Sequence, residues 1–82
     1  MTKYAPLAEH LRTSTPPVRM TFDEVGALVG GLPPSAYRYR AWWANNGGTH
    51  VQAVAWLEEG WRVDEVDLGR QVAAFGRHGR GR

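Results

Sequence analysis

The residues best suited to chemistry lie in the middle of the chain, where arginines alternate with aromatic side chains. Four aromatic residues and two arginines fall within seven positions, in the run Tyr37-Arg38-Tyr39-Arg40-Ala41-Trp42-Trp43. Guanidinium groups donate to phosphate oxygens, and aromatic rings stack on unpaired bases. No Asp or Glu occurs from residue 26 to residue 57, so the local sequence leaves both arginines uncompensated. The segment therefore predicts contact with a nucleic acid.

Further polar residues extend this candidate surface. Asn45 and Asn46 carry amides of the kind that read an adenine edge, and a hairpin tip is expected at Arg70. Thr49, His50 and Gln52 open an expected helix, whose N-terminal dipole favours phosphate. The predicted nucleic-acid contacts are Arg38, Arg40, Trp43, Asn45, Asn46, Thr49, His50, Gln52 and Arg70.

Aromatic side chains also fill the cores of small domains, since each buries roughly 150–250 Å². We expect Tyr4, Trp61 and Phe75 to be core residues, together with one of the adjacent pair Trp42 and Trp43. Neighbouring residues on a helix point about 100° apart, so the other tryptophan should be partly exposed.

Catalytic and metal-binding signals are weak. The chain has no cysteine, its two serines lie outside any nucleophile-elbow motif, and its three histidines are widely spaced. Asp64, Glu65 and Asp67 form an acidic cluster, but no lysine follows at nuclease spacing, and we interpret them as a solvated hairpin face. We expect no enzyme activity, no metal and no cofactor.

Composition places the chain among small globular proteins. It has 82 residues, 43% hydrophobic and 22% charged, which suits one domain. Nine of the ten basic residues are arginine, and the formal net charge is +2. Apolar stretches are too short to span a membrane, and the N-terminus lacks the pattern of a secretory signal, so we expect a cytoplasmic protein without membrane contact.

The periodicity predicts mixed helices and strands. Helices are expected over residues 4–12, 21–32 and 49–59, and the aromatic segment 35–43 suits either a helix or an irregular arm. Thr21 with Glu24, and Thr49 with Gln52, both match the capping-box pattern at a helix start.

Strands are expected over residues 18–22, 61–66 and 72–75. A turn at residues 67–70 should place Gly69 at positive φ, and the slip in apolar phase predicts a bulge near Asp64 and Glu65. This order predicts an α+β, winged-helix-like fold: a three-helix core, a small antiparallel sheet and a C-terminal β-hairpin wing. We expect one domain over residues 1–76 and a disordered Gly/Arg tail over 77–82.

Three motifs carry a resemblance to a known family. They are Leu32-Pro33-Pro34-Ser35-Ala36, Trp42-Trp43-Ala44-Asn45 and Gln52-Ala53-Val54-Ala55-Trp56-Leu57-Glu58-Glu59-Gly60-Trp61. With them the chain resembles a small bacterial domain of unknown function, which occurs mostly as short stand-alone proteins, many from actinomycetes. The resemblance covers nearly the whole chain and implies family membership without an assigned activity.

Three functions fit these observations. The first is a small DNA-binding protein of winged-helix (helix-turn-helix) type, whose contact residues should share a face free of Asp and Glu. The second is a protein–protein interaction module, an adaptor or inhibitor that uses exposed Arg, Trp and Tyr side chains or forms a homodimer. The third is a reader of a modified or flipped base, with Trp42, Trp43 and Asn45 forming its pocket.

Overall fold

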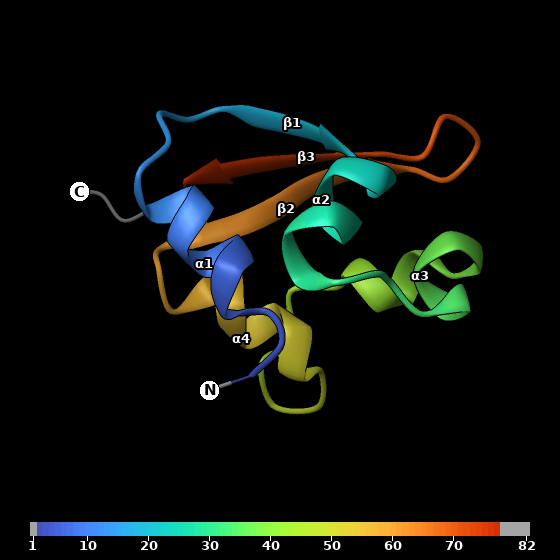
Figure 1. Cartoon of the computed structure of the whole chain (residues 1–82), viewed down its shortest axis with the longest axis horizontal. Helices are drawn as coiled ribbons and strands as arrows, with labels where there is room; N and C mark the ends of the chain where they lie inside the picture. The colour runs from blue at the N-terminus through green and yellow to red at the C-terminus, as the bar shows by residue number, and fades with distance from the viewer. Residues whose placement is uncertain (1, 78–82) are drawn as a thin grey trace.

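A computed structural model describes residues 2–77, which form a mixed α+β domain (Figure 1). In chain order the elements are α1 (Ala5–Arg12), β1 (Val18–Thr21), α2 (Phe22–Val29), α3 (Pro34–Arg38), the 3-10 helix η1 (Arg40–Trp43), α4 (Val51–Leu57), β2 (Trp61–Asp67) and β3 (Val72–Arg77). None of the helices within these residues is long and apolar enough to cross a membrane.

The three strands form an antiparallel sheet in the order β1-β3-β2. The first strand pairs with the hairpin, since Val18 lies opposite Phe75. The register of β2 against β3 shifts between Val63 and Glu65, which confirms the predicted bulge. Arg77, predicted to begin the tail, is the last residue of β3, and residues 78–82 lie outside the described part of the chain.

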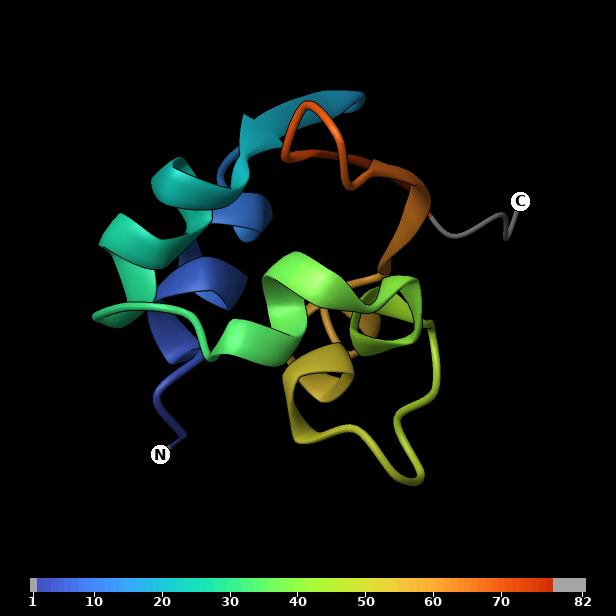
Figure 2. The same cartoon turned by 90° about the vertical axis from the view of Figure 1, so that its right-hand side faces the viewer.

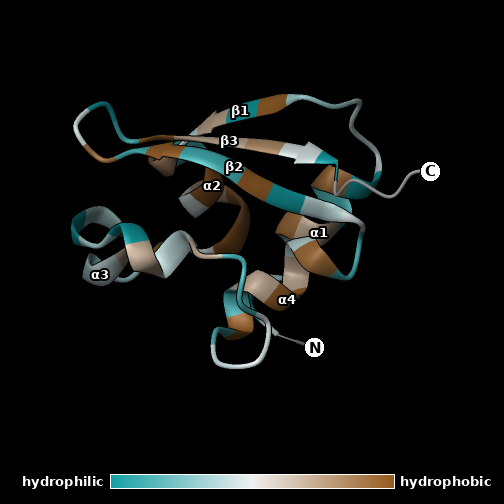
Figure 3. Cartoon of the chain, turned by 180° about the vertical axis from the view of Figure 1, so that it is seen from behind, coloured by the Kyte–Doolittle hydropathy of each residue, from teal (hydrophilic) through white to brown (hydrophobic). Residues whose placement is uncertain are grey.

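The helices cover one face of the sheet, and the core lies between these two layers (Figure 1). Brown, apolar positions gather where α1, α2 and α4 face the strands (Figure 3). The largest fully buried side chains are Trp43, Trp56, Trp61, Phe22, Phe75, Leu7, Leu11 and Val25. Tyr4, Trp61 and Phe75 are therefore core residues, as predicted.

The start of α2 follows the local sequence. The Thr21 hydroxyl accepts from the Glu24 N–H at 3.0 Å, and the Glu24 carboxylate accepts from the Thr21 N–H at 2.8 Å. This reciprocal capping box satisfies two backbone donors that a helix start leaves free. The helix ends at Gly30, whose φ of 82° suits a residue without Cβ.

Two other local predictions are wrong. Helix α4 begins at Val51 with His50 as N-cap and no side-chain cap, so Thr49 and Gln52 form no capping box. In the β2–β3 turn the positive φ, 58°, belongs to Gln71 rather than to Gly69. The Asp67 side chain instead stabilises this turn, because it accepts from the Arg70 N–H at 2.9 Å.

Candidate functional site

We use the term arm for residues 34–46, which comprise α3, Tyr39, η1 and the three residues that follow. The arm is anchored by Trp43, which is 1% exposed and stacks on Phe22 with ring centroids 4.8 Å apart. Its indole N–H donates to the carbonyl of Ala36 at 2.8 Å. Trp42 is half-buried against Tyr4. Trp43, predicted as a contact residue, is thus part of the core, because its ring fills the space between α2 and α4.

Asn45 ties the arm to the edge strand β2. Its Oδ1 accepts from the N–H of Val63 at 2.8 Å, and its Nδ2 donates to the carbonyl of Val63 at 2.9 Å. The same Oδ1 accepts from the indole N–H of Trp56 at 2.9 Å. The carboxamide thus pairs with Val63 as the backbone of a further strand would. The sequence suggested that this amide reads an adenine edge. An amide engaged in these bonds is not free to do so.

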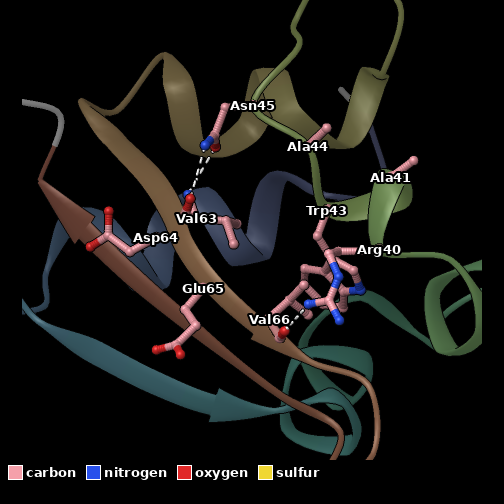
Figure 4. A pocket seen from close by; sticks show the side chains of 9 residues that line it. All are labelled: Arg40, Ala41, Trp43, Ala44, Asn45, Val63, Asp64, Glu65 and Val66. Atoms are coloured by element: carbon pink, nitrogen blue, oxygen red, sulfur yellow. Dashed lines mark hydrogen bonds between the residues drawn. The ribbon is translucent and has the colours of Figure 1, made fainter.

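Arg40 makes a second bridge from the arm to β2, since its Nη1 donates to the carbonyl of Val66 at 2.5 Å. Between the bridges of Asn45 and Arg40 lies a groove with a volume of about 480 Å³. We call it the β2 groove, and it is lined by Arg40, Ala41, Trp43, Ala44, Asn45, Val63, Asp64, Glu65 and Val66 (Figure 4). No sequence motif indicated this groove, because its two walls are about 20 residues apart in the chain.

The exposed cationic residues of this region belong to the arm and to the hairpin tip. Tyr39 is 60% exposed, has an extended backbone between α3 and η1, and follows exposed Arg38 in the chain. The side chain of Arg70, at the hairpin tip, is 86% exposed. The arm and the hairpin tip lie on the same side of the molecule (Figure 2). The arm, which carries Arg38 and Arg40, and the hairpin tip, which carries Arg70, are therefore on one side.

That side is not free of carboxylates. The prediction that the contact residues share a face without Asp and Glu is therefore wrong. Asp67 Oδ2 lies 4.0 Å from Arg70 Nε, and Asp64 and Glu65 belong to the wall of the β2 groove. The carboxylates come from β2, which is distant from the arm in sequence but adjacent to it in space. The absence of Asp and Glu from residues 26–57 therefore did not predict a surface without carboxylates around the arm.

Tyr37, on α3, lies next to the start of α2. Its hydroxyl donates to Asp23 Oδ1 at 3.3 Å, and its ring packs edge-on against Phe22. Desolvation raises the pKa of Tyr37 above its ordinary value of 10.0, and the Asp23 carboxylate raises this pKa further. The phenol is therefore neutral at physiological pH, and it helps to fix α3 on α2.

The start of α4 contributes less than the sequence suggested. Gln52 is 6% exposed and its Nε2 donates to the carbonyl of Trp42 at 2.8 Å, so this predicted contact residue is buried. Thr49 is exposed, whereas His50 is half-buried.

The loop before α4 covers part of that helix. A Cβ on Gly47 would lie 3.4 Å from Leu57 and 3.6 Å from Val54, so the loop packs closely on α4. Asn46 is exposed and its Oδ1 accepts from the N–H of Gly48 at 3.1 Å. Because α4 itself contains no basic residue, the cationic groups of this region come from the arm and the hairpin.

Comparisons with known proteins add a family match. A family model described as "Domain of unknown function (DUF7662)" matches residues 4–78. No curated protein and no solved structure matches the chain. Within residues 2–77, no three His, Asp or Glu side chains are grouped so as to hold a metal ion.

Proposed function

The chain belongs to the DUF7662 family, a domain of unknown function, and from its residues we propose that it is a small, non-enzymatic DNA-binding protein. The observation that carries this proposal is the exposed Arg38-Tyr39-Arg40 run of the arm, which lies on the same side of the molecule as the hairpin tip with Arg70. Guanidinium groups on either side of an exposed aromatic ring suit a ligand that alternates phosphates with flat bases.

The arrangement of elements supports a winged-helix interpretation. The domain has four α-helices, and in this interpretation α1, α2 and α4 would form the three-helix core and the β2–β3 hairpin the wing, with β1 beside β3. In this interpretation Arg70 is the wing residue, and the arm supplies the contacts that a recognition helix would make elsewhere. Helix α4 is a poor recognition helix, because Gln52 is buried and the preceding loop covers Val54 and Leu57.

The proposal is tested with the double variant Arg38→Ala/Arg70→Ala, which leaves the bridge from Arg40 to Val66 intact. Each lost phosphate contact should reduce the slope of log affinity against log salt by about 0.9, so the variant should lose nearly two units of slope. Fluorescence anisotropy with mixed-sequence DNA at several salt concentrations measures this slope.

The matched control is Arg19→Ala/Arg62→Ala, which removes the same charge from exposed positions on β1 and β2. Its slope should stay close to that of the wild type if the arm and hairpin hold the phosphates. Equal loss of slope in both double variants would show that binding follows net charge alone. Wild-type protein that binds no DNA at low salt and tens of micromolar would refute the proposal.

One observation favours the second candidate, a protein-interaction module. Asp64 and Glu65 line the same groove as Arg40, and a protein partner with charges of both signs tolerates such a surface better than a phosphate backbone does. An interface centred on Tyr39 should persist at moderate salt, where DNA binding through a few phosphates weakens strongly. Salt dependence of partner capture therefore separates the two candidates.

A further inference from the structure

We infer that the β2 groove binds one unpaired guanine base of a nucleic-acid strand whose phosphates are held by the exposed arginines. This inference rests on the proposed function and names the form of nucleic acid that the site selects. The volume of the β2 groove, about 480 Å³, falls within the range of small-ligand sites, which is about 300–1,000 Å³.

The chemistry of the walls suits a flat, largely apolar group. Ala41, Ala44, Val63 and Val66 contribute aliphatic surface, and Trp43 closes the inner side. A phosphate placed among these aliphatic side chains would lose hydration, and Arg40 at one end of the groove would have to compensate for most of that loss. A nucleobase presents two apolar faces and a hydrogen-bonding edge, which is the combination that such walls accept.

Arg40 favours guanine among the bases. Its Nη1 is held by the carbonyl of Val66, which fixes the guanidinium at one end of the groove beside Trp43 (Figure 4). A guanidinium has five N–H donors, so further donors are available after this bond is made. Guanine offers two adjacent acceptors, O6 and N7, which form a frequent bidentate pair with arginine.

The charges around the groove favour a single strand over a duplex. The side chains of Asp64 and Glu65 point away from the arm over β2 (Figure 4). Arg62 Nε pairs with Asp64 Oδ1 at 2.8 Å, so the negative charge on the outer side of the β2 wall comes mainly from Glu65. A duplex has one phosphate charge per about 1.7 Å of axis, twice the density of one strand. A single strand can keep its phosphates near Arg38 and Arg70 and turn one base into the groove, whereas a duplex brings its second phosphate row towards these carboxylates.

The test uses the whole chain and three fluorescein-labelled DNA probes. These are a thymine 12-mer, the same 12-mer with one central guanine, and the duplex of the guanine-containing strand. One bidentate guanine contact discriminates by about 5-fold or more. We therefore expect the guanine-containing strand to bind at least about 5-fold more tightly than the thymine strand, and more tightly than the duplex.

Arg40→Lys tests the contact itself, because lysine keeps the charge but lacks the planar fork of donors. It should bring the ratio of the two single-strand affinities close to one, whereas the chemically matched Arg19→Lys, on β1, should keep the wild-type ratio. Equal affinities for both single strands, tighter binding of the duplex, or an unchanged ratio in Arg40→Lys would each overturn the inference while leaving DNA binding intact. Absence of binding to all three probes would refute the proposed function together with the inference.

Discussion

Asn45→Ala should destabilise the domain far more than its position in a surface loop suggests. The substitution removes one acceptor and one donor that together serve three groups: the N–H and C=O of Val63 and the indole N–H of Trp56. Trp56 is 0% exposed, so its orphaned N–H alone should cost about 1–3 kcal/mol. The two groups of Val63 lie on an edge strand that water can reach in part, and each should add about 0.5–1 kcal/mol.

The expected loss in the free energy of unfolding is therefore about 2–5 kcal/mol. For a domain of this size, 1 kcal/mol shifts Tm by about 4–8 °C, so Tm should fall by roughly 8–40 °C. Urea and thermal denaturation, followed by tryptophan fluorescence and near-ultraviolet circular dichroism, measure both quantities.

The neighbouring residue provides the control. Asn46 makes one side-chain hydrogen bond among the described residues, to the exposed N–H of Gly48, so Asn46→Ala should cost about 0.5 kcal/mol or less. Asn45→Asp can still accept the hydrogen bonds from the Val63 N–H and the Trp56 indole N–H, but its second oxygen would face the carbonyl oxygen of Val63. The stability of this variant should therefore lie between those of wild type and Asn45→Ala. If Asn45→Ala and Asn46→Ala were equally stable, the three bonds would contribute nothing and our account of the arm would be wrong.

Two further comparisons use the same denaturation measurements. Thr21→Ala should lower the free energy of unfolding by about 1 kcal/mol because it breaks a capping box, whereas Thr49→Ala should be nearly neutral because Thr49 caps nothing. Equal losses in the two variants would contradict the assigned start of α4. Trp43→Phe should lower the free energy of unfolding by at least about 1 kcal/mol more than Trp61→Phe does. The indole N–H of Trp43 bonds to Ala36, while that of buried Trp61 has no acceptor among the described residues. The reverse order of stabilities would show that ring packing outweighs these bonds.

Local sequence predicted the elements whose stabilising contacts are local. The capping box at Thr21 and Glu24 joins residues three positions apart, so the pattern and the structure agree. The same pattern at Thr49 and Gln52 failed because the Gln52 amide bonds to the carbonyl of Trp42 on the arm. A tertiary contact therefore overrode a local preference, which sequence spacing alone does not reveal.

The candidate site depended more on contacts between distant residues, and it was predicted less well. The alternation of arginine and tyrosine correctly marked an exposed segment, since Arg38 and Tyr39 are both on the surface. The role of Asn45 was missed because its partner Val63 is 18 residues away and bonds through its backbone, which carries no sequence signal. Asp64 and Glu65 were expected on a solvated hairpin face, but their place in the wall of a groove shared with the arm was missed, because β2 is distant from the arm in sequence.

The central position of β3 has a consequence for how the chain folds during its synthesis. Strand β3 is the last of the three strands in chain order, yet both β1 and β2 depend on it for their pairing in the described sheet. The pairing of Val18 with Phe75 joins positions near opposite ends of the described chain, so it cannot form while translation has reached only β2. Such distant pairings fold slowly and leave unpaired strand edges exposed in the interval. Nascent chains that stall before residue 72 should therefore aggregate or be degraded rather than accumulate as a folded fragment.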